Sequence, residues 1–149
     1  MRLHWHRRDL RVADNLGLAA SDEQTVPVFV FDRDVLDHAA PPRVAFMLDA
    51  LASLRAAYRE RGSDLLVAHG DPVAVLPDLA AQYGADTVTW CKEYSGLGRE
   101  RDARVRQALD EAGVARQAVQ DAVLHEPGTI TTNEGDPYQV FTYFSKKWH

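Results

Sequence analysis

Five short apolar runs, separated by longer stretches of helical periodicity, constrain the fold of this chain most strongly. The runs are rich in Val, Leu and aromatic residues and are mostly continuous, which predicts strands that are buried on both faces. The predicted strands are Arg2–His6, Val26–Phe31, Asp64–His69, Asp86–Cys91 and Val114–Gln120. A glycine shortly before each of the last three strands is typical of the end of a helix.

The stretches between the strands carry helix-start signals and apolar residues at helical spacing. Pro41-Pro42 is a tolerated start for a helix, and Asp71-Pro72 is typical of an N-cap followed by the first helical residue. Pro77 removes one backbone hydrogen bond, so it predicts a restart or a kink of the second of these helices. A further helix is predicted from about Arg99 to Ala112.

This alternation of strands and helices predicts an α/β fold with a Rossmann-like, doubly wound, five-stranded parallel sheet flanked by helices. Right-handed crossovers between parallel strands leave few topologies, and the strand order 3-2-1-4-5 is the commonest for five strands. The 149 residues are enough for one domain with a core of ordinary size.

Charged residues gather where the first predicted strand ends, in the segment His6-Arg7-Arg8-Asp9. In a doubly wound sheet, ligands bind beyond the carboxyl ends of the strands, at the switch point between strands 1 and 4. Phe31-Asp32 follows strand 2 and Cys91–Tyr94 follows strand 4 at the same edge. Guanidinium groups, carboxylates and aromatic walls suit a planar ligand with polar or anionic edges.

The charges after the first strand also have a structural interpretation. Arg and Asp side chains that alternate at a buried chain reversal can form internal ion pairs that hold the loop. Asp14 or Asn15 would then cap the first helix. For Arg11, Asp14 and Asn15 the sequence favours this structural role at least as much as contact with a ligand.

Common catalytic and phosphate-binding motifs are absent, so the sequence predicts no catalytic residues. There is no G-x-x-x-x-G-K-[ST] loop and no G-x-S-x-G elbow, and the glycines of Ser95–Gly98 predict a turn instead of a dinucleotide site. His4 and His6 share one face of a strand, but no third ligand of suitable spacing is evident, so no metal site is expected. Cys91 ends a buried strand and is typical of inert packing.

Charge and hydropathy limit the classes of partner. A formal net charge of −5 argues against a domain that grips nucleic acid over its whole surface. No apolar run approaches the roughly 20 residues that a membrane helix needs. Arg7-Arg8 comes too early for a signal peptide, so we expect a cytoplasmic protein without membrane contact.

The C-terminal segment departs from the alternating pattern. Its Pro and Gly residues predict loops and turns, and an aromatic stretch follows that could form a short helix. These aromatic residues either pack against something downstream or wrap back onto the sheet. They are Tyr138, Phe141, Tyr143, Phe144 and Trp148.

Several blocks of sequence, in order, carry a likeness to known proteins. The first is HWHRRDLRVADNLGLAAS, with the pattern aromatic-x-Arg-Arg-Asp-Leu-Arg-x-x-Asp-Asn-x-x-Leu. Others are PPRVAFMLDALASLRAAYRERGSDLLVAHGDPVAVLP, GRERDARVRQAL and HEPGTITTNEGDPYQVFTYFSKKW. Together these blocks cover essentially the whole chain and resemble the N-terminal part of the DNA photolyase/cryptochrome family, most of all the class I cyclobutane-dimer photolyases of microbes.

The resemblance implies a light-harvesting domain. Residues 1–122 would hold an antenna chromophore that passes excitation to FAD, and residues 123–149 would begin the interdomain linker. The FAD-binding helical domain, whose flavin splits pyrimidine dimers in damaged DNA, would be the partner of this domain in the parent protein and is absent from the chain. We therefore expect no DNA repair by this chain alone.

Members of this family use a deazaflavin, a methenylated folate or a flavin as antenna. By matching positions, the resemblance to deazaflavin-binding members implies these binding residues: Arg8, Phe31, Asp32, Phe46, Met47, Ala50, Lys92, Glu93 and Tyr94. In the segment after strand 4, Ser95 stands where the family commonly has a second acid, which helps to hold the pterin in folate-binding members. We therefore expect a deazaflavin before a folate or a flavin, and an empty pocket is the other outcome left open.

Three other functions stay open on the sequence. A signalling cryptochrome shares the antenna fold, and nothing in this stretch separates signalling from repair. A free-standing nucleotide-binding α/β module would need a phosphate loop, for which Gly70-Asp71 and Gly96–Gly98 are weak candidates. A structural or interaction domain would dock a partner through the C-terminal aromatic residues.

Overall fold

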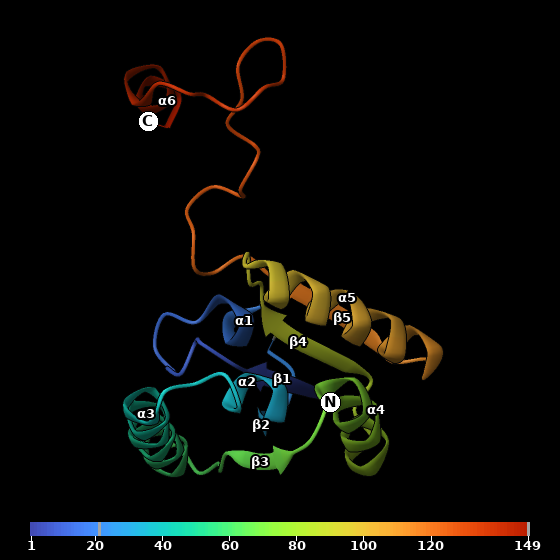
Figure 1. Ribbon diagram of the computed structural model, residues 1–149. Helices are drawn as coiled ribbons and strands as arrows, with labels where there is room; N and C mark the ends of the chain where they lie inside the picture. Colours follow the sequence, from blue (N-terminus) through green and yellow to red (C-terminus); the bar gives the residue numbers. More distant parts are fainter. Residues whose placement is uncertain (21, 149) are drawn as a thin grey trace.

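The sheet has five parallel strands in the order β3-β2-β1-β4-β5, as the sequence predicts. The computed structural model describes residues 1–20 and 22–148. Its strands are β1 (Arg2–His6), β2 (Thr25–Phe31), β3 (Leu66–His69), β4 (Thr87–Cys91) and β5 (Ala115–Val119) (Figure 1). The doubly wound α/β fold is therefore confirmed.

Helices cover the two faces of the sheet in separate layers (Figure 1). One layer consists of α1 (Leu16–Ala19), α2 (Arg33–Leu36) and α3 (Pro41–Arg59). The other consists of α4 (Pro72–Tyr83) and α5 (Gly96–Glu111). The chain winds outward from β1 first to one side and then to the other, so the change of face falls between β1 and β4.

The side chains of β1 alternate between two different interiors. Leu3 and Trp5 are fully buried in an apolar core that includes Leu76 of α4 and Leu109 of α5. His4 and His6 are equally buried, but they belong to the opposite face, where α3 supplies its own apolar cluster. The centre of that second face is therefore polar. The sequence of β1 does not show by itself that its two histidines are buried there.

The proline signals place the helix starts correctly. α3 begins at Pro41, and Asp71 caps α4 by accepting a backbone N–H at 2.9 Å. Pro77 lies inside α4 without a restart, because only one backbone hydrogen bond is lost and the helix stays packed through buried Leu76. Gly84 ends α4 with a φ of 62°, a left-handed conformation that glycine adopts at little cost.

One helix was missed by the sequence analysis, and the start of another was predicted too late. α2 was not expected, and its N-cap is Asp32, whose side chain accepts a backbone N–H of the first turn. α5 starts at Gly96 instead of near Arg99, with the Ser95 side chain accepting the N–H of Gly98 at 3.1 Å. The glycines of this stretch therefore belong to the first turn of a capped helix and not to a separate turn.

The edge strands are more exposed than predicted. Ala115, Arg116 and Gln117 of β5 are exposed, as are Val67 and His69 of β3. The expectation of strands buried on both faces therefore fails for β3 and β5, although it describes β1 and β4 well. The reason is that each edge strand has a single neighbour, and one-turn α1 is too short to cover β5.

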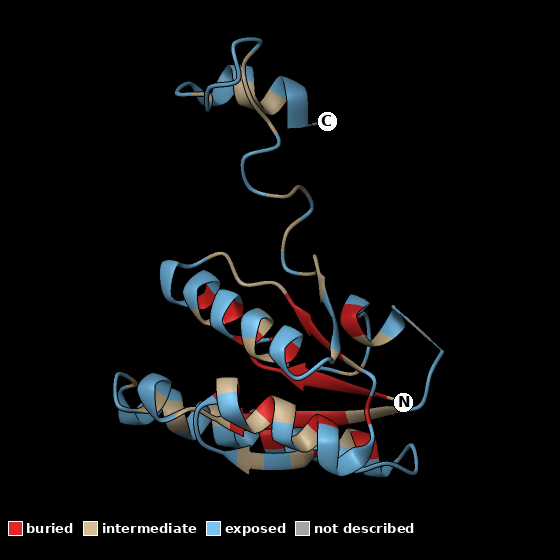
Figure 2. Cartoon of the chain, turned by 90° about the vertical axis from the view of Figure 1, so that its right-hand side faces the viewer, coloured by how far each residue is buried: buried red, intermediate tan, exposed pale blue. Residues whose placement is uncertain are grey.

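The C-terminal segment lies apart from the sheet. It consists of an irregular stretch and α6 (Phe141–Trp148), and it extends away from the layered core (Figure 1). None of the described residues from 120 to 148 is buried (Figure 2). The aromatic residues therefore do not wrap back onto the sheet. Within the described parts of the chain, no helix is long and apolar enough to cross a membrane.

Replacement of a core leucine tests this packing. Leu76→Ala should lower the free energy of unfolding by about 2–5 kcal/mol, because it removes buried methyl groups and leaves a cavity. Leu97→Ala, at a side chain that is 83% exposed, should change it by less than about 0.5 kcal/mol. Urea denaturation measures both, and similar losses in the two variants would contradict the assignment of α4 to the core.

Candidate functional site

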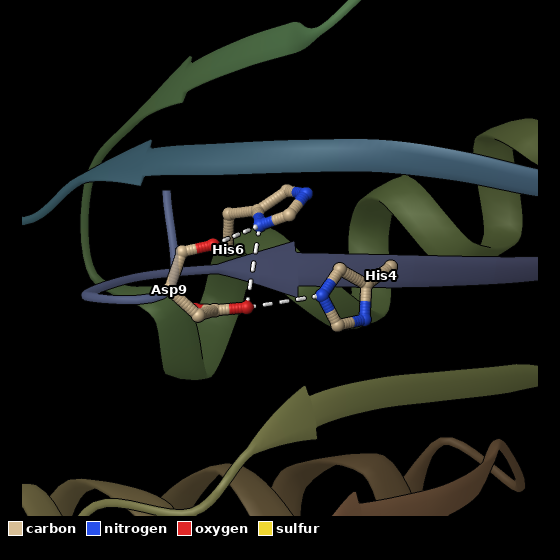
Figure 3. A group of neighbouring side chains, drawn as sticks. All are labelled: His4, His6 and Asp9. Carbon is tan, nitrogen blue, oxygen red and sulfur yellow. Dashed lines mark hydrogen bonds and ion pairs between the residues drawn. The ribbon is translucent and has the colours of Figure 1, made fainter. Parts of the chain in front are cut away.

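The loop after β1 is organised around the buried carboxylate of Asp9 (Figure 3). Asn15 Nδ2 donates to Asp9 Oδ2 at 2.9 Å, and the backbone N–H of Arg7 donates to Oδ1 at 2.9 Å. The rings of His4 and His6 approach Oδ2 as well, with Nε2 of His4 at 3.2 Å and Nδ1 of His6 at 3.3 Å. Several N–H groups therefore compensate one buried charge where the chain reverses.

The ring nitrogen that faces away from Asp9 also has a hydrogen-bond partner in each histidine. His6 Nε2 lies 2.6 Å from the hydroxyl of Tyr58 on α3, and His4 Nδ1 lies 3.0 Å from Oγ1 of Thr89 on β4. Because an ionised Asp9 can only accept, we assign the proton of each ring to the nitrogen that faces Asp9. Tyr58 then donates to the other nitrogen of His6, and Thr89 Oγ1, which also lies 3.3 Å from the carbonyl of Leu3, is the partner of the other nitrogen of His4.

This network sets the protonation states of its members. Burial by itself would raise the pKa of Asp9, but hydrogen bonds from His4, His6 and the Arg7 backbone outweigh burial and hold that pKa well below its usual range. Burial lowers the pKa of His4 and raises the pKa of Tyr58. At neutral pH the cluster thus holds an ionised Asp9 beside neutral His4 and Tyr58.

The same three residues form a group of potential metal ligands. The sequence shows no third ligand beside His4 and His6, and that expectation is wrong, because the chain reversal brings Asp9 to both rings. One ligand atom from each residue lies within 4.8 Å of the other two. The ring N–H groups of the two histidines already face the Asp9 carboxylate, so a cation would have to displace ring protons. We therefore assign this cluster a structural role.

Arg7 is a second buried charge that the sequence pattern does not single out. Its guanidinium donates to Asp102 of α5 and to the carbonyl of Cys91 at the end of β4. Its Cζ also lies 4.6 Å from the centre of the Trp5 ring. Arg8, the next residue, is exposed. Two adjacent arginines look alike in sequence, and only the tertiary contacts of the bend that follows β1 separate the buried one from the exposed one.

A cleft of about 520 Å³ opens where β1 and β4 end. This is the switch point at which the fold class predicts a ligand site. The cleft brings together four of the predicted binding residues, which are Arg8, Lys92, Glu93 and Tyr94. Its other lining residues are Asp9, Arg11, Cys91, Asp121 and Ala122.

The cations of the cleft differ in how they are paired. Arg8 has no hydrogen bond or ion pair with any residue that the structure describes. Lys92 Nζ donates to Glu126 Oε2 at 3.1 Å, and the Tyr94 hydroxyl donates to the same oxygen at 3.2 Å. Burial and the charge of Glu126 raise the pKa of Tyr94, which keeps its phenol protonated. Among the described residues that line the cleft, Arg8 is therefore the cation without an acidic partner.

The start of α1 is fixed by Asn15 and Asp121. Asn15 is the N-cap, and its side chain accepts a backbone N–H of the first turn at 3.1 Å. Asp121 accepts the N–H of Leu16 at 3.0 Å and forms an ion pair with Arg11 at 2.7 Å. Asp14 adopts a left-handed φ of 53°, and Arg11 donates to its carbonyl at 2.6 Å. These contacts shape the loop that borders the cleft.

Glu93 and Asp32 meet through Arg101 of α5. Arg101 donates to Glu93 at 2.9 Å and lies 3.8 Å from Asp32. Glu93 also lies 3.5 Å from Nε of Arg7. Gly98 makes this packing feasible, since a Cβ there would lie 2.7 Å from both Cβ and Oε2 of Glu93. Glu93 is thus largely engaged by guanidinium groups of the protein itself.

The remaining predicted binding residues do not line this cleft. Phe31 stacks on His69 with ring centres 5.0 Å apart, and Met47 packs against the apolar cluster of α3. Ala50 is half-buried, whereas Phe46 is 77% exposed. A contribution of α3 to ligand binding therefore stays a prediction, because the cleft is formed by the loops after β1, β4 and β5.

Cys91 lies under the cleft as a protonated thiol. Burial raises the pKa of Cys91 to about 12, and the charges of Asp9 and Asp121 act in the same direction. The thiolate, which is the reactive form, is therefore scarce at neutral pH. Sγ lies 3.5 Å from Oδ1 of Asn15, so the thiol donates to the cap of α1.

Comparison with known proteins assigns the chain to a family. The DNA photolyase family matches residues 2–149. The chain belongs to this family. It is 59% identical to a deoxyribodipyrimidine photo-lyase of Halobacterium salinarum, over 99% of the chain and 33% of that relative. Cryptochromes are among the further relatives.

Solved photolyase structures share the fold. A class III photolyase of Agrobacterium tumefaciens matches with a TM-score of 0.84 and 32% identity, over 95% of the chain and 30% of that structure. An archaeal photolyase of Sulfolobus tokodaii matches with a TM-score of 0.80 and 25% identity, over 98% of the chain and 34% of that structure. The chain thus spans about a third of the length of these photolyases.

The buried cluster predicts a pH-dependent stability. Because burial lowers the pKa of His4, the unfolded state takes up a proton below about pH 6.5 that the folded state does not. The free energy of unfolding should therefore fall as the pH is lowered through that range. Asp9, whose pKa is depressed, should add a second loss below about pH 4.

Urea denaturation at several pH values between 5 and 7 measures the effect. His4→Gln should reduce the slope of the free energy of unfolding against pH, by an amount that corresponds to at most one proton. His38→Gln, at an exposed histidine, should keep the slope of the wild type. An unchanged slope in His4→Gln would contradict the neutral state assigned to this ring.

Proposed function

We propose that residues 1–122 form the antenna domain of a DNA photolyase, where a chromophore absorbs light and passes excitation to FAD elsewhere in the parent protein. The observation that carries this proposal is the cleft at the β1–β4 switch point, where Arg8 has no partner among the described residues, in a chain of this family. Excitation transfer depends on distance and orientation, so it needs no acid, base or nucleophile. The protonated Cys91 and the fully paired His4 are consistent with such a role.

The residues of the cleft fit a planar chromophore with an anionic group. The cleft has a volume of about 520 Å³, which lies within the range of small-molecule sites, roughly 300–1,000 Å³. Arg8 would bind the anionic group through charge-assisted hydrogen bonds, and the Tyr94 ring offers an aromatic surface beside it. The bound chromophore would supply the absorption of near-UV or blue light, and these side chains would hold and orient it.

A deazaflavin is the chromophore that we propose. Ser95, which stands where folate-binding members have an acid, is occupied in capping α5 and offers no carboxylate to a pterin. The Sulfolobus tokodaii photolyase is described with two FAD molecules and a novel light-harvesting cofactor. A flavin is therefore the principal alternative occupant of the cleft.

The parent protein would use this domain for the repair of pyrimidine dimers. We propose that residues 123–149 lead to a FAD-binding helical domain and that damaged DNA contacts that domain. The net charge of −5 is consistent with a DNA-binding surface outside this chain. The photolyase of Halobacterium salinarum, 59% identical, favours repair over cryptochrome signalling. Membership of class I and a cytoplasmic location stay predictions.

The identity of the bound molecule tests this function. The purified chain should show near-UV or blue absorption, and mass analysis after denaturation should identify a released deazaflavin; if none co-purifies, added deazaflavin should bind. A released flavin or folate would keep the antenna function and overturn the choice of chromophore. An adenine nucleotide would contradict the antenna function and favour a nucleotide-binding module.

Two variants separate binding from stability. Arg8→Ala should weaken chromophore binding by about tenfold and change the free energy of unfolding by less than about 0.5 kcal/mol, because the side chain is exposed and unpaired. Glu93→Ala should cost about 1–3 kcal/mol of stability, since it leaves Arg7 and Arg101 with fewer acceptors. Arg61→Ala, in the turn just after α3, serves as the charge control. Unchanged binding in Arg8→Ala would contradict the location of the site.

A further inference from the structure

Glu126 ties the C-terminal segment to the edge of the cleft. Its carboxylate accepts from Lys92 Nζ at 3.1 Å and from the Tyr94 hydroxyl at 3.2 Å. Both donors belong to the stretch after β4 that lines the cleft. One acid from a segment without buried residues thus neutralises a cation at the proposed binding site.

The backbone of Glu126 is held by a turn of its own segment. The N–H and the hydroxyl of Thr129 both donate to the Glu126 carbonyl, at 3.1 and 2.8 Å. Gly128, inside this turn, has a φ of 87°, which a type II turn requires at that position. Pro127 precedes it and restricts the chain further. The turn therefore presents the Glu126 side chain, which is itself about a third exposed.

The residue before Glu126 connects the same segment to α6. His125 Nε2 donates to the carbonyl of Trp148 at 3.0 Å. The two rings also pack edge to face with centres 4.9 Å apart. The adjacent residues His125 and Glu126 therefore contact different parts of the molecule. Glu126 contacts the residues that line the cleft, and His125 contacts α6.

The contact between Lys92 and Glu126 is suited to exchange. Each side chain is about a third exposed, and ion pairs of that kind contribute little to stability. A phosphate or carboxylate held by Arg8 in the same cleft would compete for Lys92 and Tyr94. It would also repel the like charge of Glu126 at the edge of the cleft. A neutral ligand would do neither.

We propose that Glu126 is a displaceable strap that makes the cleft selective for ligands with an anionic group. Binding of such a group expels the Glu126 carboxylate and frees residues 122–129 from Lys92 and Tyr94, whereas a neutral ligand leaves the strap in place. Occupancy of the cleft is thereby transmitted through His125 to α6. This inference rests on the proposed function, because it takes the cleft to be the chromophore site.

Two flavins that share one ring system test the strap. FMN carries a phosphate that riboflavin lacks. Glu126→Gln should bind FMN about threefold or more tightly than the wild type, because the competing charge is gone. Its affinity for riboflavin should change by less than about twofold. Glu134→Gln, which removes a charge of the same segment without a contact to the cleft, should behave as the wild type. Fluorescence titration at low salt measures these affinities.

Hydrogen exchange of residues 120–148 gives the second readout. FMN should accelerate exchange of this segment in the wild type and leave it unchanged in Glu126→Gln, where the strap is already released. Riboflavin should change neither protein. An FMN-induced slowing in the wild type would overturn the strap, because it would mean that the ligand orders the segment.

The outcomes distinguish the strap from the function on which it rests. Equal or weaker FMN binding in Glu126→Gln than in Glu134→Gln, together with weaker binding in Arg8→Ala, would overturn the strap and retain the cleft as the ligand site. Absence of binding of either flavin to all of these proteins at millimolar concentration would overturn the strap, and added deazaflavin would then decide the proposed function separately.

Discussion

The carboxylate of Asp9 is the interaction on which the rest of the site depends. It is buried and ionised at the carboxyl end of β1, and it accepts from the Arg7 backbone, from Asn15 and from two histidines of the strand. These contacts join the end of β1, the reversal that follows it and the start of α1 in one network. Gly17 completes the fit, since a Cβ there would lie 2.4 Å from the His4 ring.

This network determines which charges are left for a ligand. Arg7 turns toward Asp102 and the end of β4, and Glu93 is taken up by Arg101, so both contribute to the scaffold. Arg8 lines the cleft, is exposed and has no partner among the described residues. Among the described residues, the site therefore consists of one free cation, Arg8, and the ion pair between Lys92 and Glu126. Binding and orientation, and not covalent chemistry, are what such an arrangement can perform.

The sequence predicts the sheet well, because five apolar runs, Pro41 and the Asp71 cap are local signals that place the strands and helices, and right-handed crossovers then leave few strand orders. It also places the cleft, since the switch point follows from topology. The roles of Arg7 and Glu126 escape sequence reasoning because each depends on a partner distant in the chain, Asp102 and Lys92 respectively. The exposure of β5 and the approach of Asp9 to both histidines likewise arise from tertiary packing, which no local periodicity encodes.

Removal of the Asp9 carboxylate tests the central claim most directly. Asp9→Ala should lower the free energy of unfolding by about 3 kcal/mol or more, because it leaves buried N–H donors without an acceptor. Asp78→Ala, which removes an exposed acid from α4, should cost less than about 0.5 kcal/mol. Urea denaturation at pH 7 compares the two variants. A loss below about 1 kcal/mol in Asp9→Ala would contradict the claim that this carboxylate organises the end of β1 and the cleft beside it.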